Sequence, residues 1–251
     1  MPDIVATLRA AGCVFAEDEA ALILSTARSD AELERMVAAR SEGQPLEIVL
    51  GWAELCGIHF SVQPGVFVPR RRTEYLVELA RAMRPRVVLD LCCGSGAVGA
   101  AVGAEELHAA DIDPVAVECA RGNVRGTVYE GDLFEPLPAS LRGRVDVLTL
   151  IAPYVPSDEI ELLPREARLF EPRSTLDGGS DGLDLVRRVA AVAAEWLAPG
   201  GSVLTEVSER QAPVVVAMFR ANGLTAEVHC DEDRWATVVR GTAAETRAAG
   251  A

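Results

Sequence analysis

VVLDLCCGSGAV, residues 87–98, is the stretch that decides the fold. Its apolar run reaches Asp90 and then opens into a turn of small residues, which predicts a buried strand that leads into a ligand-binding loop. Short side chains let a backbone approach a ligand closely, and a helix that begins near Ser95 would aim its free amide groups at that ligand. We therefore expect a nucleotide-like cofactor to contact Asp90, Cys92, Cys93, Gly94, Ser95 and Gly96.

The identity of this cofactor can also be addressed from the sequence. Residues 94–99 fit the G-x-G-x-x-G pattern of dinucleotide enzymes, and Asp111 follows at about the distance of a ribose-binding acid. Two features weigh against a nicotinamide dinucleotide: an acid, Asp90, closes the strand, and no second nucleotide-binding half follows residue 150. S-adenosylmethionine carries a sulfonium and an ammonium group, so a carboxylate together with backbone amides suits it better.

Apolar strand candidates alternate with helical segments from Arg86 onward. This rhythm predicts an α/β fold with a doubly wound, mostly parallel, seven-stranded sheet. The last two candidates flank a charged turn at residues 231–233, which is typical of antiparallel strands at an edge. The expected strands are Val87–Leu91, Glu106–Asp111, Gly126–Tyr129, Val145–Leu150, Ser202–Val207, Leu224–Cys230 and Trp235–Arg240.

Acidic residues stand at the ends of three successive expected strands. In an open α/β sheet, ligands bind outside the carboxyl ends of the strands. Asp111 is placed to accept both ribose hydroxyls and Asp132 to accept the exocyclic amine of an adenine, with Ile112 and Leu133 beside them. The alternatives are local roles, since Asp111 could cap a helix, although Asp113 is the better cap, and Asp132 could form a turn.

Hydrophobic spacing divides the chain into further segments. Residues 1–50 show helical spacing and are expected to form a small helical domain. Residues 51–70 form an expected linker, because strand-like alternation from Gly57 to Val68 surrounds a Pro64-Gly65 turn and predicts a hairpin. The cofactor domain is expected over residues 71–241, and residues 242–251 are expected to form a flexible tail.

Composition narrows the partners and the compartment. A net charge of −14 argues against direct binding of nucleic acid, although Arg70, Arg71 and Arg72 form a local basic patch. No leader and no apolar run near twenty residues is present, which predicts a cytoplasmic protein without membrane contact. The six cysteines show no metal-ligand spacing, so we expect no metal site. The chain has no lysine, which excludes Schiff-base chemistry by that residue.

The segment LIAPYVP, residues 150–156, makes the chain recognisable. It resembles the HemK/PrmC family of protein glutamine methyltransferases, class I enzymes that use S-adenosylmethionine to modify the glutamine of a Gly-Gly-Gln loop in release factors. The similarity runs from about Gly51 to Gly241. The motifs that carry it are VPR at 68–70 with Thr73 and Glu74, the cofactor motifs at 90–96 and 110–114, LDGGSDGL at 176–183, and PGG at 199–201.

The resemblance implies a helical substrate-recognition domain, a hairpin linker and a methyltransferase domain. The family's loop normally reads Asn-Pro-Pro-Tyr; the Asn side chain and a proline carbonyl accept hydrogen bonds from the acceptor amide, and the Tyr stacks over it. An amide nitrogen is a poor nucleophile, so such positioning matters. Carried over, the catalytic positions are Ile151, Ala152, Pro153 and Tyr154, and the substrate-binding positions are Phe67, Pro69, Arg70 and Glu74.

This chain departs from the family at two of those catalytic positions. Ile151 stands in place of the Asn and cannot accept a hydrogen bond, so a buried acceptor amide would lose roughly 1–3 kcal/mol. Ala152 replaces the first Pro, and Cys92 stands where the first glycine of the cofactor turn is expected.

Three hypotheses follow from these departures. One is a methyltransferase with an altered acceptor, a small molecule or a peptide. The second is glutamine methylation of a release factor, with the Ala152 carbonyl sufficing. The last is a catalytically silent cofactor-binding module that acts by protein interaction. If a general base is needed, Glu74 and Asp158 are candidates, whereas the three histidines, His59, His108 and His229, are expected to be structural. The oligomeric state is not predicted.

Overall fold

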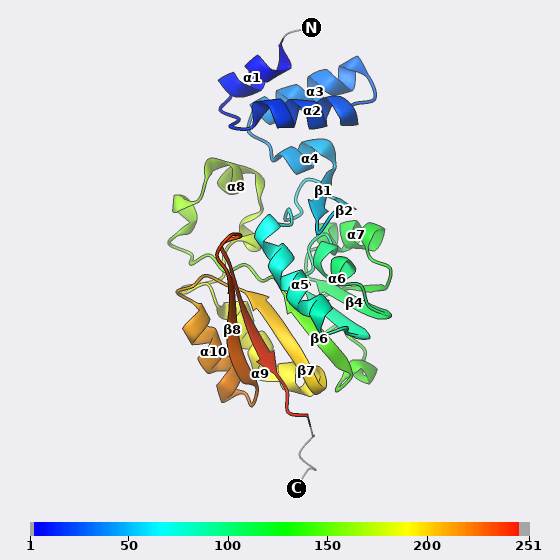
Figure 1. Ribbon diagram of the computed structural model, residues 1–251, viewed down its shortest axis with the longest axis vertical. Helices are drawn as coiled ribbons and strands as arrows, with labels where there is room; N and C mark the ends of the chain where they lie inside the picture. The colour runs from blue at the N-terminus through cyan, green and yellow to red at the C-terminus, as the bar shows by residue number, and fades with distance from the viewer. Residues whose placement is uncertain (1–2, 246–251) are drawn as a thin grey trace.

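A cluster of four short helices forms one end of the molecule in the computed structural model, which describes residues 3–245 (Figure 1). They pack around an apolar core of their own, centred on Leu8, Ile23 and Met36. The Ser29 hydroxyl caps the third helix by accepting a hydrogen bond from the Glu32 amide at 3.2 Å. The helices are α1 (Ile4–Ala10), α2 (Ala16–Thr26), α3 (Asp30–Ser41) and α4 (Leu46–Leu50).

A β-hairpin follows the helices, but its position differs from the expectation. Strands β1 (Trp52–Leu55) and β2 (Ile58–Ser61) pair antiparallel, with Leu55 opposite Ile58. The turn is Cys56-Gly57, where both residues have positive φ angles of 53° and 74°, as a two-residue hairpin turn requires. Pro64 and Gly65 lie beyond the hairpin. The expectation of a hairpin around them was wrong because it overlooked the first strand.

The seven-stranded sheet confirms the predicted fold class. Its order is β5-β4-β3-β6-β7-β9-β8, and β9 is antiparallel to both of its neighbours, β7 and β8, whereas the other pairs are parallel. The strands are β3 (Val87–Leu91), β4 (Glu106–Asp111), β5 (Thr127–Glu130), β6 (Val145–Leu150), β7 (Leu197–Glu206), β8 (Thr225–Asp231) and β9 (Ala236–Thr242). The strand order reverses between β3 and β6, and such a switch point is where open α/β sheets bind ligands.

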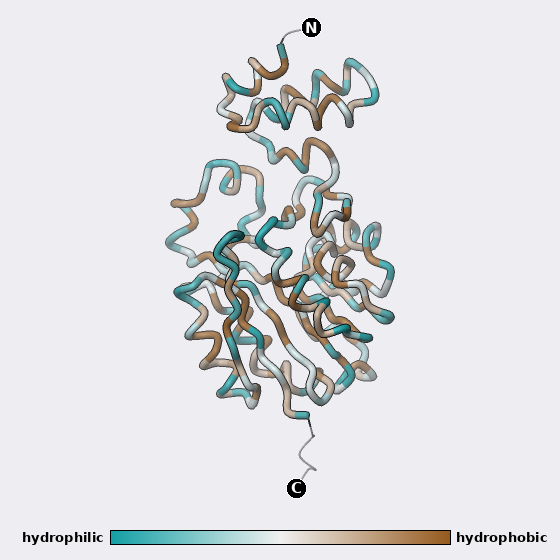
Figure 2. The backbone as a smooth tube through the Cα atoms, viewed as in Figure 1, coloured by the Kyte–Doolittle hydropathy of each residue, from teal (hydrophilic) through white to brown (hydrophobic). Residues whose placement is uncertain are grey.

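Alternation along β3 builds the two layers that enclose the sheet. Val88 faces the core shared with α5 and α6, whereas Leu89 and Leu91 face the opposite core with α9 and α10. In Figure 2, which colours each residue by its hydropathy, hydrophobic residues run through the middle of the sheet between these layers. The helices of the two layers are α5 (Glu74–Ala82), α6 (Ala97–Val102), α7 (Pro114–Asn123), α9 (Asp184–Trp196) and α10 (Ala212–Ala221).

Short helical segments and the chain end complete the fold. One helix, α8 (Arg165–Phe170), and four 3₁₀ turns, η1 (Arg71–Thr73), η2 (Ala139–Leu141), η3 (Ile160–Leu162) and η4 (Arg173–Thr175), lie in the connections. At the end of the chain, Thr242 still belongs to β9 and the Ala243 amide donates to the Gly201 carbonyl, so the expected tail is tied down at its start. Residues 246–251 lie outside the described part.

Candidate active site

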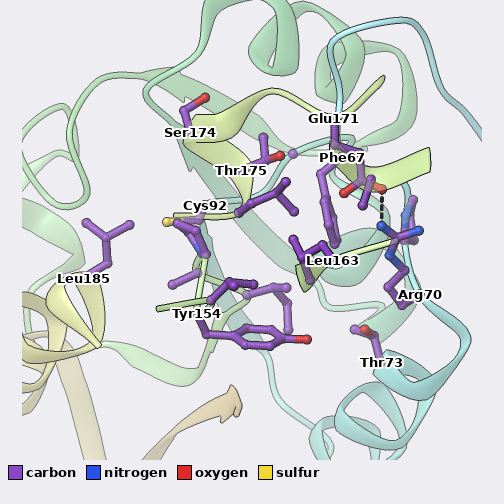
Figure 3. A pocket seen from close by; sticks show the side chains of 18 of the residues that line it. Phe67, Arg70, Thr73, Cys92, Tyr154, Leu163, Glu171, Ser174, Thr175 and Leu185 are labelled. Carbon is purple, nitrogen blue, oxygen red and sulfur yellow. Dashed lines mark hydrogen bonds and ion pairs between the residues drawn. The ribbon is translucent and has the colours of Figure 1, made fainter. Parts of the chain in front are cut away.

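A cavity of about 1000 Å³ opens at the carboxyl ends of β3, β4 and β6, where the strand order reverses. Its walls come from segments far apart in the chain: the linker, the turn after β3, the loop after β6, and residues 158–185. Figure 3 shows Phe67, Arg70, Cys92 and Tyr154 around this space. The predicted site residues that line it are Phe67, Pro69, Arg70, Asp90, Cys92, Cys93, Gly94, Ser95, Asp111, Ile112, Ile151, Ala152, Pro153 and Tyr154.

The turn after β3 forms the floor of one half of the cavity. Cys92 has a φ of 54°, a conformation that favours glycine, which explains why a glycine was expected there. Burial raises the pKa of its thiol, so the thiol stays protonated. A Cβ added at Gly94 would find its nearest contact, the Phe67 carbonyl oxygen, only at 4.0 Å. The backbone at Gly94 therefore faces open space in which a ligand fits.

Asp90 lies beneath this turn and is 1% exposed. One oxygen accepts from the Thr149 hydroxyl at 2.7 Å and the other from the Gly99 amide at 2.9 Å. Burial raises the pKa of this carboxyl to about 7, because desolvation disfavours the charged form. A cation in the cavity would favour the ionised form. Asp90 is thus poised to change its charge when such a ligand binds.

Asp111 joins the end of β4 to the same turn. Its carboxylate accepts from the Gly94 amide at 2.8 Å and from the Asp113 amide at 3.0 Å, while burial raises the pKa of the carboxyl. The N-cap of α7 is Asp113, which accepts from the Val115 amide, so Asp111 is not a cap. A carboxylate with one bond on each oxygen still has lone pairs for ligand hydroxyls.

Three residues expected at the cofactor do not line the cavity. The Asp132 carboxylate accepts from the Arg188 guanidinium at 2.7 Å, and Leu133 is buried in the core beneath α9. Gly96 instead lets α6 pack on α7, because a Cβ there would come within 2.5 Å of Val124. The helix also begins at Ala97 rather than near Ser95. These local contacts could not be separated from ligand contacts by sequence pattern.

The loop after β6 is fixed by a second segment, Leu176–Leu183, that cradles it. The Val155 amide donates to the Leu176 carbonyl at 3.0 Å, and the Gly178 amide donates to the Val155 carbonyl at 2.9 Å. A Cβ at Gly182 would lie 2.1 Å from the Tyr154 carbonyl oxygen, so only glycine fits. The same carbonyl accepts from the Gln211 side-chain amide at 2.9 Å. Backbone contacts thus set the shape of this loop.

The Tyr154 side chain is held by three residues for which the sequence pattern predicted no such role. Arg72 donates to the Tyr154 hydroxyl and, at 2.7 Å, to Glu206. Thr73 donates to the other oxygen of Glu206 at 2.8 Å, and Tyr154 to the first at 3.4 Å. Glu206 is 4% exposed at the end of β7. Its place at a strand end is the signal that could have identified it.

Some of the residues expected to bind substrate line the cavity, and one instead holds the hairpin in place. Phe67, Pro69 and Arg70 line the cavity, and the Arg70 guanidinium lies 4.8 Å from the centre of the Phe67 ring. Arg70 also forms an ion pair with Glu171 (Figure 3). Glu74, expected to bind substrate or act as a base, does not line the cavity; its carboxylate accepts from the Cys56 amide at 3.0 Å and anchors the hairpin.

The remaining candidates for acid–base chemistry are placed as follows. Asp158 lines the cavity. His59 stacks on Trp52 with ring centres 4.1 Å apart, and His229 pairs with Glu227 on β8. His108 lies between Glu106 and the Tyr129 hydroxyl on the sheet. None of the three histidines lines the cavity. Within residues 3–245, no three His, Cys, Asp or Glu side chains gather as metal ligands would.

The sequence of this chain is similar to those of known proteins. Residues 57–142 fit the family model described as methyltransferase small domain. A release factor glutamine methyltransferase of Geobacter sulfurreducens is 40% identical over 199 residues, which cover 75% of this chain and 69% of the relative. The chain belongs to the release factor glutamine methyltransferase (HemK/PrmC) family. A second such enzyme, from Streptomyces coelicolor, is 36% identical over 76% of this chain and 72% of its own length.

Solved structures share the fold of this HemK/PrmC chain. A methyltransferase from Pyrococcus furiosus matches with a TM-score of 0.56 and 17% identity, over 76% of this chain and 91% of that one. A 16S rRNA methyltransferase of T. thermophilus, solved with AdoMet and guanosine, has a TM-score of 0.53 and 19% identity, over 76% of this chain and 49% of its own. The chain is an S-adenosylmethionine-dependent methyltransferase, and the resemblance noted in its motifs is confirmed. No helix within residues 3–245 is long and apolar enough to cross a membrane.

Proposed function

We propose that this enzyme methylates the side-chain amide of a glutamine in a peptide-chain release factor. The observation that carries the proposal is the loop after β6, whose Pro153 and Tyr154 line a cavity that also holds the turn after β3. Relatives that share 36–40% of their residues with this chain are named release factor glutamine methyltransferases. The proposal therefore combines the family's loop position with the cavity in which that loop lies.

The turn after β3 is the proposed cofactor wall. S-adenosylmethionine, when bound, supplies a methyl group on a positively charged sulfur. We assign its contacts to the open backbone at Gly94, to Asp111 as acceptor of hydroxyl groups, and to the exposed Ile112 as an apolar contact. Asp90 would supply negative charge beneath the turn. Asp132, which does not line the cavity, is not assigned to the cofactor.

The loop after β6 is the proposed acceptor wall. Tyr154 would stack its ring on the planar amide, and Arg72 and Glu206 position that ring by holding its hydroxyl. Within residues 3–245, no hydrogen bond uses the Ala152 carbonyl, so this oxygen is available to accept from the amide NH₂. Alignment by these groups supplies much of the rate when the nucleophile is weak. The residues of the helical domain would recognise the rest of the acceptor protein.

One observation favours a second candidate, an acceptor that is not a planar amide. Ile151 lines the cavity and packs against the apolar core next to β6, where it offers no lone pair. A small molecule or a peptide with a more nucleophilic nitrogen, an oxygen or a carbon as acceptor would not need one. The third hypothesis, a silent binding module, is not retained, because the chain is a methyltransferase.

Substituting Ile151→Asn separates the two candidates. The purified enzyme and the variant are incubated with S-adenosylmethionine and a bacterial release factor, and the methylated residue is located by mass spectrometry. We expect methylation of a glutamine by the wild type, and a roughly tenfold to hundredfold faster rate in the variant because the lost acceptor is restored. No methyl group on the release factor with either protein would refute the proposal and leave the altered acceptor.

A further inference from the structure

Two buried side-chain polar atoms lack a hydrogen-bond partner within residues 3–245, namely Thr205 Oγ1 and Glu171 Oε2. Thr205 lies inside β7, whereas Glu171 lines the cavity. The Glu171 side chain is only 3% exposed, so its second oxygen is shielded from water as well as unpaired. A buried acceptor in this state destabilises the fold until a donor reaches it.

The first oxygen of Glu171 explains how the carboxylate is held. Oε1 accepts from the Arg70 guanidinium, which joins two segments 101 residues apart. Arg70 is itself fixed by the Phe67 ring at 4.8 Å. Its side chain is 36% exposed, and its other N–H groups make no hydrogen bond among the described residues. Oε2 of Glu171 and the free donors of Arg70 therefore lie in one wall of the cavity (Figure 3).

We propose that Arg70 and Glu171 form a two-point clamp for a primary carboxamide of the methyl acceptor. Glu171 Oε2 accepts one amide N–H, and an unused N–H of Arg70 donates to the amide oxygen. A carboxamide carries both a donor and an acceptor on one plane, whereas a carboxylate carries acceptors only and would face Glu171 with like charge. The clamp rests on the proposed acceptor site and makes it selective for glutamine over glutamate.

Charge in the rest of the wall is consistent with a neutral ligand. Arg210, which also lines the cavity, is paired with Glu159 at 3.0 Å. Arg72 is paired with Glu206 at 2.7 Å. The cationic side chains at these two places are thus already neutralised. An anionic acceptor would find only Arg70, whose own charge is balanced by Glu171.

The test measures the preference for a glutamine peptide over a glutamate peptide. If Glu171 had only a structural role, its substitution would lower the affinity for both peptides alike. Affinities of a Gly-Gly-Gln peptide and its Gly-Gly-Glu counterpart are determined by calorimetry for the full chain with bound S-adenosylhomocysteine. We expect the wild type to bind the Gln peptide at least about tenfold more tightly. In Glu171→Gln, the new NH₂ replaces an acceptor by a donor, so the preference should fall below about threefold or reverse.

Two controls keep the outcome interpretable. Glu161→Gln changes a neighbouring carboxylate that is 81% exposed and does not line the cavity, and it should leave the preference unchanged. The affinity of Glu171→Gln for S-adenosylhomocysteine should stay within about twofold of the wild type, which also shows that the variant is folded. An unchanged preference in this variant would overturn the clamp, as would a wild type that binds neither peptide or does not distinguish them. Weakened cofactor binding without a change of preference would assign Glu171 to the cofactor ammonium and also overturn it. A preserved preference in the wild type without methylation of an intact release factor would instead refute the proposed function alone.

Discussion

The two halves of the cavity are built in different ways. The proposed cofactor wall comes from residues close in sequence: within one β-α-β unit, Asp111 accepts from the Gly94 amide and Asp90 accepts from the Gly99 amide. The proposed acceptor wall comes from partners far apart, such as Arg72 and Glu206, which are separated by 134 residues. The local wall tolerates little change at its two carboxylates, because each of them orders the backbone around it. A composite wall can change one contributor at a time, which fits the unusual residue at position 151.

Gly182→Ala gives the largest expected effect, because it breaks the composite wall at its support. The added Cβ would meet the Tyr154 carbonyl oxygen at 2.1 Å, and the φ of 76° already disfavours a side chain. We expect kcat/KM to fall by roughly hundredfold or more, while the dissociation constant of S-adenosylhomocysteine changes by less than about threefold. Gly223→Ala is the matched control, since Gly223 has a similar φ of 81° with open space around it. Equal losses in both variants would attribute the effect to backbone strain and not to the loop.

Asp111→Ala tests the local wall. The Gly94 and Asp113 amides would lose their acceptor, and the turn would lose its anchor. We expect the dissociation constant of S-adenosylmethionine to rise tenfold to hundredfold, which corresponds to about 1.4–2.8 kcal/mol. Calorimetry measures this. If the affinity for the cofactor were unchanged, the assignment of the cofactor to this wall would be wrong.

Asp90 gives the local wall a dependence on pH. Its pKa is about 7 in the folded protein against an ordinary value of 3.8, so the folded state binds the proton more tightly. The resulting stabilisation is full below pH 3.8 and is lost as the pH rises to about 7. Asp90→Asn cannot titrate. Urea unfolding at pH 5 and pH 8 should show a loss of roughly 1–3 kcal/mol in the wild type beyond that in the variant. Parallel behaviour of the two proteins would contradict the raised pKa.

Cys92→Gly gives the smallest expected effect. The φ of 54° is strained for cysteine, and glycine adopts it freely. We expect a gain of about 0.5–1 kcal/mol in the free energy of unfolding, partly offset by the greater freedom of glycine in the unfolded chain. Thermal unfolding followed by circular dichroism measures the change, and a lower melting temperature would show that the thiol contributes packing that outweighs the strain.

The same contrast explains what sequence alone could predict. The strand, the turn and Asp111 follow from patterns within about 25 residues, and the structure brings them together. Glu171 and Glu206 were not predicted as site residues, because their partners are distant in sequence and no local pattern indicates an ion pair. Asp132 and Glu74, in contrast, were expected to bind ligands because their local sequence positions fit that role. In the structure neither lines the cavity: Asp132 is turned to Arg188, and Glu74 to the Cys56 amide. Which donors reach a carboxylate depends on the tertiary structure and cannot be read from a local pattern.

The backbone cradle around the loop after β6 has a consequence for how such enzymes diversify. A Cβ at Gly178 or Gly182 would meet the carbonyl oxygen of Pro153 or Tyr154, so these contacts hold the loop by its backbone and do not involve the side chain at position 151. Mutation can therefore sample new side chains there without first destroying the site. In evolutionary terms, the backbone contacts would preserve the geometry of the loop while its preference for a methyl acceptor changes. Under the proposed function, a change of the codon for position 151 would alter how the acceptor fits while the methyl-transfer scaffold persists.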